Sequence, residues 1–389
     1  MLLEALPHLR CPSQIVKTGR LAPCGGHLNL SDGIVAIRAD PSYEKDILEA
    51  VVTCTKCGTS YPVILGVLVL VPDIDAYIRN NYHYLCRAIA EGAIRGQSAS
   101  KEMIEFLEQR GGRTGRPAAV GEWDQDLPWV LSRYIQAHYG TLCDRLKPSS
   151  GAWSTFVTGY EREQAGPYDV LLGMLTKFGA TRPPGSAQVA IDVGCSVGRM
   201  AHRVAPLFGF VYGVDLSFGA ILAARRLVRG SPDAMKEYRV LLEGGEWDEV
   251  AQALVVERRA NVEFFVASAT ALPFAEGYAD CLVAVNLLDV LAQPEKLFGE
   301  AARVLGYPGM FLMADPYCWR GPVAAKLLKN LPGETSDSLD RSKAEKFVEL
   351  ALRHYGFAIV CHEYFVPWLL RHHARHWEVF LCHCICATR

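Results

Sequence analysis

The sequence has 389 residues, of which 50% are hydrophobic and 21% are charged, the balance of a folded protein with a substantial core. A single core stops growing near about 250–300 residues, so two or three domains are expected. The 40 basic and 42 acidic side chains give a formal charge of -2. This balance excludes a whole-chain field that would draw the protein onto nucleic acid or an anionic membrane.

No export or membrane segment is predicted. The first residues lack a basic start, a long apolar run and a small-residue cleavage site. The longest uncharged apolar stretch, residues 63–71, is far shorter than the ~20 residues of a spanning helix. We therefore expect a cytoplasmic protein without a membrane partner. The 13 cysteines are then expected to be reduced thiols or metal ligands rather than disulfides.

The first part of the chain divides into a β-rich module and a helical connector. Residues 1–73 contain glycines at turn positions and short β-branched runs, which predict a small β-rich module. Its four cysteines are Cys11, Cys24, Cys54 and Cys57. Residues 74–154 carry apolar residues at helical spacing, with a glycine-rich loop at 111–121 and a helical segment at 128–146.

Residues 155–389 are expected to form one α/β domain. A helix is predicted at 167–179, and from residue 188 strands and helices alternate, which predicts a parallel sheet covered on both faces. The expected strands are 188–194, 210–215, 261–268, 279–286 and 309–316. Residues 231–259 are longer than an ordinary connection and are interpreted as an inserted helical excursion. Two apolar alternating runs, 357–370 and 376–389, suit an antiparallel terminal pair.

A strand, glycine turn, helix and second strand between residues 189 and 215 predict a cofactor site. In IDVGCSVGR, Gly194 and Gly198 let the backbone approach a ligand at the helix start, where a side chain would collide. Asp215 ends the next strand, where a carboxylate can accept two hydrogen bonds from ribose hydroxyls.

Two features of this turn favour S-adenosylmethionine over a dinucleotide. Asp192 lies two residues before the first glycine, where its charge attracts the cationic amino acid end of S-adenosylmethionine and repels a pyrophosphate. The spacing G-C-S-V-G also differs from the dinucleotide pattern. Dinucleotide binding and a purely structural turn remain as alternatives, in which Asp192 and Asp215 are helix-capping or turn carboxylates.

VAIDVGCSVGR and YGVDLS resemble the first two motifs of class I S-adenosylmethionine-dependent methyltransferases. The resemblance implies a Rossmann-like α/β fold, with a doubly wound, mostly parallel seven-stranded sheet. Ser268 stands where the family often has an acidic residue that contacts adenine. The implied cofactor-binding residues are Asp192, Gly194, Cys195, Ser196, Gly198, Asp215, Leu216, Ser268, Ala269 and Asn286.

Four further runs are similar to the C-terminal methyltransferase domain of ovothiol synthases, which methylates an imidazole nitrogen of a thiolated histidine. They are GCSVGR, NLLDVLAQPEKLF, DPYCW and VPWLLRHHARHWEVF, in that order within residues 155–389. The iron-dependent sulfoxide-synthase portion of those proteins is not apparent. The resemblance implies a small-molecule acceptor with an imidazole or similar ring.

Three candidate catalytic residues lie at the carboxyl ends of the fourth and fifth expected strands, where an open sheet binds its ligands. Asn286 is expected to hydrogen-bond the acceptor or cofactor, and Asp289 to accept a proton or orient an imidazole N–H. Tyr317 is expected to wall an aromatic pocket around a cationic or heteroaromatic group. The competing interpretations are a turn residue for Asn286, a helix-start residue for Asp289 and core packing for Tyr317.

PCGGHL and LEAVVTCTKCGTSYPVILGVLVLVPD resemble the zinc ribbon of activator subunits of tRNA and protein methyltransferases. The resemblance implies a structural zinc ion held by Cys11, Cys24, Cys54 and Cys57. A metal-free ribbon and redox chemistry at Cys54 and Cys57 are alternatives. The ribbon also raises a second functional hypothesis, an RNA or protein methyltransferase that docks its substrate there. A non-catalytic scaffold that binds the cofactor is the third.

Overall fold

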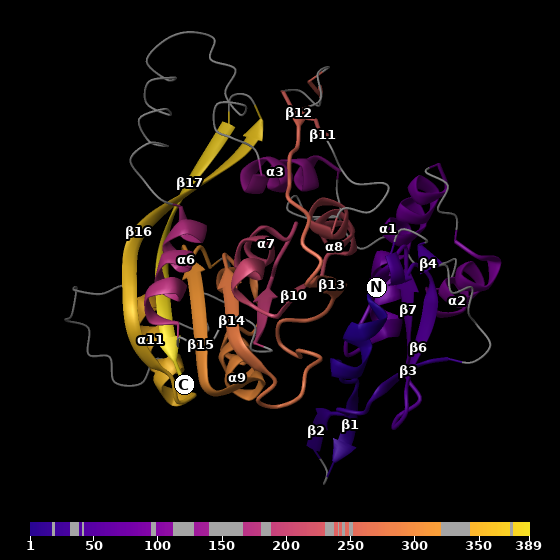
Figure 1. Cartoon of the computed structure of the whole chain (residues 1–389), viewed down its shortest axis with the longest axis horizontal. Coiled ribbons are helices and arrows are strands. Elements are labelled where there is room, and N and C mark those ends of the chain that lie inside the picture. Colours follow the sequence, from indigo (N-terminus) through magenta and orange to yellow (C-terminus); the bar gives the residue numbers. More distant parts are fainter. Residues whose placement is uncertain are drawn as a thin grey trace.

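The architecture is that of a computed structural model, shown in Figure 1. The residues that it describes are 1–17, 20–31, 39–40, 43–94, 99–111, 128–139, 166–179, 188–229, 237–239, 241–242, 246–248, 252–319, 343–373 and 376–389. The predicted loop at 111–121 and the end of the helix predicted at 128–146 lie largely outside these ranges.

A seven-stranded sheet forms the centre of the molecule, in the order β13-β10-β9-β14-β15-β17-β16. Its strands are β9 (Val189–Val193), β10 (Phe210–Asp215), β13 (Val262–Val266), β14 (Ala279–Val285), β15 (Leu305–Asp315), β16 (Ala358–His373) and β17 (His376–Thr388). The first five pair in parallel, whereas β17 is antiparallel to both β15 and β16. The predicted mostly parallel sheet and its antiparallel terminal pair are therefore confirmed.

Helices cover this sheet, because even its edge strand β13 is buried on both faces. Every residue of β13 is buried, as expected for a parallel strand with both faces covered. The helices that accompany the sheet are α6 (Pro167–Phe178), α7 (Arg199–Val204), α8 (Phe218–Ala224), α9 (Glu295–Val304) and α11 (Lys343–His354). Across the described ranges, no helix is long and apolar enough to cross a membrane.

The N-terminal part is rich in short strands, as predicted. A four-stranded sheet, the N-terminal sheet, has the order β3-β6-β7-β8. These strands are β3 (Leu28–Leu30), β6 (Ala50–Cys54), β7 (Ser60–Ile64) and β8 (Val67–Leu68). Two small antiparallel pairs accompany them, β1 (Gln14–Lys17) with β2 (Arg20–Pro23), and β4 (Ala39–Asp40) with β5 (Tyr43–Ile47). Helices α1 (Ile74–Ile94), α2 (Lys101–Gly111) and α3 (Pro128–Tyr139) follow.

The N-terminal sheet is joined to the edge of the central sheet through backbone hydrogen bonds. Just after β8, Val69 bridges Val266 of β13 in parallel, and the Leu70 N–H donates to the Val266 carbonyl at 2.8 Å. A second bridge pairs Leu9 with Phe274. The edge of β13, which would otherwise expose unpaired backbone groups, is thereby covered.

The insertion between β10 and β13 differs from its prediction. Its described residues form a two-stranded antiparallel pair, β11 (Glu237–Tyr238) with β12 (Gln252–Ala253), and not helices. The Ser132 hydroxyl of α3 donates to the Arg239 carbonyl just after β11. The insertion thus packs against α3 (Figure 1), a long-range contact that competes with local helical preference.

A buried ionic cluster lies where the N-terminal part meets the central sheet. Nη2 of Arg225 lies 2.9 and 3.0 Å from the two carboxylate oxygens of Asp46, and Nη1 donates to Glu263 of β13. Nη1 of Arg229 lies 3.2 Å from Oε2 of Glu263. Burial raises the pKa of Glu263, but the Arg225 and Arg229 charges outweigh burial and leave that pKa below its usual value. All four side chains are buried, so each charge depends on its partners.

Replacing Arg225 with methionine is expected to destabilise the fold by about 3–5 kcal/mol, because two buried carboxylates lose their shared cation. Urea unfolding of the purified protein measures the free energy. Lys101→Ala, which removes an exposed partner of Glu105, serves as the control and should cost less than about 1 kcal/mol. A loss below about 1 kcal/mol for Arg225→Met would contradict a structural role for the cluster.

Candidate active site

The turn between β9 and α7 requires glycine at two positions. Gly194 has φ 73°, and a Cβ there would meet Cδ1 of Leu287 at 2.8 Å. Gly198 has φ 81°, and a Cβ there would meet Cε1 of Phe264 at 2.8 Å. Both contacts are shorter than real Cβ atoms make, and the left-handed backbone disfavours side chains. The turn therefore follows from the two glycines that the sequence pattern singles out.

Asp192 lies at the carboxyl end of β9, buried beneath this turn. Its Oδ2 accepts a hydrogen bond from the Ala201 N–H of α7 at 2.8 Å, so the carboxylate helps to hold the helix. Burial raises the pKa of Asp192 to about 7. The hydrogen bond from Ala201 lowers this pKa, whereas the charge of Asp215 raises it. Asp192 also borders the cavity described below. The capping role and the predicted cofactor contact are thus geometrically compatible.

Asp215 lies at the end of β10, beside the same turn. Its Oδ2 accepts from the Ser196 N–H at 3.0 Å and its Oδ1 from the Ser217 N–H at 2.9 Å. Leu216 contributes a further backbone hydrogen bond. A carboxylate offers about four lone-pair sites, so these bonds leave room for a ligand. Burial raises the pKa of Asp215.

The remaining predicted cofactor residues surround the end of β10. Leu216 is 51% exposed, directly after Asp215. The Ala267 N–H donates to the Asp215 carbonyl at 3.0 Å and brings the loop after β13 alongside. In that loop, the Ser268 and Thr270 hydroxyls lie 3.0 Å apart, and Ala269 is buried. A short polar turn thus stands where the family often places an acidic residue.

A cavity of about 560 Å³ opens beside the glycine turn. Its polar wall includes Asp192, Ser196, Asn286 and Asp289, and its aromatic wall includes Tyr134, His138, Tyr168, Trp368 and Phe380. Among the described residues that line it there is no lysine or arginine. This lining suits a planar ligand that is neutral or cationic and gives no counter-charge to a phosphate or carboxylate.

Asn286 and Asp289 follow β14 and both border the cavity, as predicted from their place in the sheet. Asn286 has φ 51°, a left-handed conformation that Asn tolerates better than most residues. Its Oδ1 accepts a hydrogen bond from Cys382 Sγ of β17 at 3.2 Å. Asp289 Oδ2 accepts from the Cys318 N–H at 2.9 Å. Each residue is therefore held by a different strand or loop.

Buried Asp315 ties together the loops that carry these residues. Its carboxylate accepts N–H bonds from Leu288 at 2.8 Å, from Asp289 at 3.3 Å and from Tyr317 at 2.8 Å. Burial, and then the charge of Asp289, raise the pKa of Asp315 well above its usual range. Asp315 thus positions the loops without bordering the cavity.

The predicted role of Tyr317 does not fit this geometry. The Tyr317 hydroxyl lies 2.9 Å from Nδ1 of His383, and the ring stacks on Trp319 with centroids 5.5 Å apart. Its neighbours Pro316 and Cys318 border the cavity, whereas Tyr317 does not. With φ 58°, the backbone at Tyr317 directs the ring into packing, which matches the competing interpretation.

Four aromatic wall residues were not predicted from the sequence: Tyr134, His138, Trp368 and Phe380. Tyr134 and His138 belong to α3, which is held over the cavity from several sides. The Tyr139 hydroxyl donates to the Val197 carbonyl of the glycine turn at 2.9 Å, and Nε of Arg133 donates to the His372 carbonyl at 3.1 Å. Because these contacts link segments far apart in the chain, no local sequence signal indicates them.

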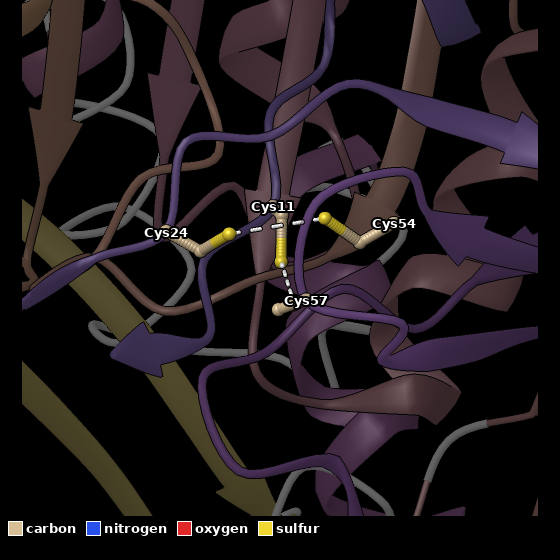
Figure 2. A group of neighbouring side chains, drawn as sticks. All are labelled: Cys11, Cys24, Cys54 and Cys57. Carbon is tan, nitrogen blue, oxygen red and sulfur yellow. Dashed lines mark hydrogen bonds between the residues drawn. The ribbon is translucent and has the colours of Figure 1, made fainter. Parts of the chain in front are cut away.

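The four N-terminal cysteines come together, although up to 46 residues separate them (Figure 2). Cys11 Sγ lies 3.6 Å from Cys57 Sγ, and Cys24 Sγ lies 3.8 Å from Cys54 Sγ. All four sulfur atoms lie within 4.8 Å of one another. A zinc ion bound tetrahedrally at about 2.3 Å separates its sulfur ligands by about 3.8 Å, so the cluster has the dimensions of a zinc site.

A second cluster, His372, His376 and Glu378, has a similar spread but different hydrogen bonding. Nη1 of Arg133 lies 3.1 Å from Nδ1 of His372. A guanidinium only donates, so Nδ1 accepts and the ring proton lies on Nε2, 3.2 Å from Oε2 of Glu378. In this tautomer, His372 offers a metal no free lone pair.

Comparisons with known proteins agree with this architecture. Residues 191–313 match a family model described as a methyltransferase domain. No curated protein matches the sequence.

Solved structures with a similar arrangement include a SAM-dependent methyltransferase from Aquifex aeolicus, with 16% identity over 56% of this chain and 88% of that one, TM-score 0.34. The complex of the Haloferax volcanii Trm112 methyltransferase activator with a putative methyltransferase is 16% identical, covering 61% and 93%, TM-score 0.36. Haemonchus contortus phosphoethanolamine N-methyltransferase 2, bound to S-adenosyl-L-methionine, is 17% identical, covering 64% and 47%, TM-score 0.36.

The family match spans β9 to β15 and includes the glycine turn, Asp192 and Asp215. Residues 191–313 therefore carry a class I methyltransferase domain, which supports S-adenosylmethionine-dependent methyltransferase activity.

Proposed function

We propose that the protein methylates a nitrogen of a small heteroaromatic molecule, an imidazole of histidine-derived type. The observation that carries this proposal is the cavity beside the glycine turn, whose lining combines aromatic side chains with carboxylates and an amide. A flat ring fits between aromatic walls, and its N–H groups find acceptors at Asp289 and Asn286. The cavity volume of about 560 Å³ suits a small molecule.

The proposed cofactor residues divide the binding of S-adenosylmethionine between two carboxylates. Asp192 attracts its ammonium group, and the free lone pairs of Asp215 accept the ribose hydroxyls. Gly194 and Gly198 allow the backbone to approach, and the Ser268–Ala269 turn borders the adenine. The cofactor supplies an electrophilic methyl group. The remaining task of the chain is to align the acceptor with it.

The rings of Tyr134, Tyr168 and Trp368 line the cavity, where their π faces can meet the reacting groups. Such faces attract a sulfonium or a cationic heterocycle by about 0.5–2 kcal/mol. Positive charge is therefore favoured on either reactant, and anionic acceptors are disfavoured.

Methyl transfer from labelled S-adenosylmethionine, with imidazole, histamine, L-histidine and host extract fractions as acceptors, tests this function. We expect label in a heteroaromatic small molecule. Label in the RNA or protein fraction instead would support a ribbon that docks a macromolecular substrate. Cofactor binding without any transfer would support a non-catalytic scaffold. Separation of the products by size distinguishes the first two outcomes.

The affinity for S-adenosylmethionine is expected to rise several-fold between about pH 6 and about pH 7.5. Burial raises the pKa of Asp192 to about 7, so the carboxylate is mostly protonated below that pH and gains its charge above it. Asp192→Asn keeps an oxygen for the Ala201 N–H but never ionises. It should weaken binding at about pH 7.5 and remove the pH dependence, as measured by calorimetry.

Asp75→Asn is the matched control, because Asp75 pairs with Arg110 on the surface of α1 and α2. This variant should bind the cofactor like the wild type at each pH. An unchanged pH dependence in Asp192→Asn would show that another group contacts the ammonium end.

We also propose that Cys11, Cys24, Cys54 and Cys57 hold a structural zinc ion. Their sulfur separations fit tetrahedral coordination, and Gly26 leaves room beside them, since a Cβ there would lie 2.6 Å from Cys54 Sγ. Burial opposes ionisation of Cys57, but hydrogen bonding with Thr59 and the neighbouring thiols lowers its pKa to about 6. Such a thiol gives up its proton readily to a metal.

The purified protein should contain about one zinc ion per chain, measured by elemental analysis. Cys54→Ser is expected to lose the metal and to lower the melting temperature by about 5 °C or more. Exposed Cys86 provides the control, and Cys86→Ser should retain both the zinc ion and the melting temperature of the wild type. A metal-free protein whose stability survives Cys54→Ser would favour the packed, metal-free ribbon, and a Cys54–Cys57 disulfide would favour redox chemistry.

A further inference from the structure

His138 and Tyr168 form a hydrogen-bonded pair on the wall of the cavity. Nε2 of His138 lies 3.2 Å from the Tyr168 hydroxyl, and both residues border the cavity. His138 is only 7% exposed, and its ring meets those of Tyr134 and Tyr168 edge-on. Within the described lining, His138 is the only histidine. An imidazole is the side chain best matched to proton transfer near neutral pH.

Both members of the pair are tied to the segment that holds the cofactor. Tyr139, next to His138, donates to the Val197 carbonyl within the glycine turn at 2.9 Å. Asp169, next to Tyr168, forms an ion pair with Arg203 of α7 at 2.6 Å. These two contacts hold α3 and α6 against the glycine turn and α7. The His138–Tyr168 pair therefore has a fixed position relative to the proposed cofactor site.

We propose that His138 accepts the proton that the acceptor ring loses from its second nitrogen on methylation, and that Tyr168 is a positioning residue for the His138 ring. This inference deepens the proposed function and rests on it. The N–CH3 bond forms as the S–CH3 bond of the cofactor breaks, and the electron pair of the broken bond remains on sulfur. The N–H proton of the methylated ring passes to His138, which becomes an imidazolium and later releases that proton to solvent. Charge and atoms balance without another reactant.

The surroundings favour this charge on His138. The other titratable groups that border the cavity are Asp192, Cys195, Asp289, Cys318, Tyr134 and Tyr168. Arg199 does not border the cavity, but its guanidinium lies over the ring of Tyr139 at 5.3 Å and its charge acts on Tyr168. The two carboxylates stabilise an imidazolium, and no lysine or arginine among the described lining residues opposes it. Burial raises the pKa of Tyr168 well above its usual range, so its hydroxyl stays protonated. In the tautomer that acts as a base, Nε2 of His138 carries the ring proton and donates it to the Tyr168 oxygen, and the Nδ1 lone pair accepts the proton of the substrate.

The test compares the full-length protein with His138→Gln, Tyr168→Phe and the control His83→Gln, which changes an exposed histidine of α1. Transfer of labelled methyl is followed from about pH 6 to about pH 9 at saturating S-adenosylmethionine, so that ionisation of Asp192 no longer limits binding. The acceptors are imidazole, L-histidine and the small-molecule fraction of host extract. Cofactor affinity is measured separately for each variant.

His138→Gln is expected to lower transfer by about 100-fold or more, with cofactor affinity within about twofold of the wild type. It should also abolish the decline in rate on the acidic side. Tyr168→Phe should retain part of the rate and shift that decline to lower pH, because the imidazolium loses the oxygen that accepts its Nε2 proton. Transfer within about threefold of the wild type in His138→Gln, or an unchanged acidic decline, would overturn the proposal.

Failure of the proposed function has a different signature. If extract supports transfer but the imidazoles do not, the acceptor class is wrong, and the His138 comparison is made with extract. If nothing is methylated, the His138 ring signal is followed by NMR in the S-adenosylhomocysteine complex while imidazole is added, with His138→Gln giving the assignment. A shift of that signal supports the placement of His138 beside the acceptor, and its absence refutes it.

Discussion

The buried pairing of Arg225 with Asp46 and Glu263 is the constraint on which the rest of the structure depends. Glu263 lies in β13, at the edge of the central sheet, and Asp46 lies in the N-terminal part. A charge buried without its partner costs several kcal/mol, so the two parts are stable only in this arrangement. Three residues beyond Glu263, Val266 accepts the hydrogen bond from Leu70, and Ala267 then bonds to Asp215. The N-terminal contact and Asp215, the carboxylate that we propose binds ribose, are thus joined by one short strand.

The features that the sequence predicts well are those that local chemistry determines. Gly194 and Gly198 sit where positive φ and close neighbours exclude any side chain, so the turn is encoded within five residues. The strands are predictable because strands buried on both faces, such as β13 and β14, appear in the sequence as continuous apolar runs. Cys54 and Cys57 stand on one tight turn, whereas Cys11 and Cys24 reach it through separate segments. Residue type alone indicates that these four cysteines share a site, because four thiolates can complete one tetrahedral zinc site.

The features that the sequence did not predict depend on contacts between distant segments. His138 and Tyr134 border the cavity only because α3 bonds to the glycine turn and to the β16–β17 hairpin. Tyr317 lies at the predicted strand end, yet one backbone angle of 58° and its hydrogen bond to His383 turn its ring away. The insertion after β10 pairs as strands where it meets α3. Strand position indicates which loop faces a site, but backbone conformation and tertiary packing decide which side chain enters it.

The charge distribution of the cavity bears on the direction of the reaction. Its described lining contains carboxylates and π faces but no cationic side chain, so it favours positive charge throughout. Positive charge moves during methylation from the sulfonium to the acceptor nitrogen and then, in our proposal, to His138. Asp289 lies on the loop after β14 and His138 on α3, so fixed groups on both sides meet this moving charge without reorganising. Once the proton leaves for solvent, neither the thioether sulfur nor the methylated ring carries a positive charge. The reacting end of the cavity therefore holds the products less tightly than the reactants, whereas the ammonium group of the cofactor keeps its attraction to Asp192.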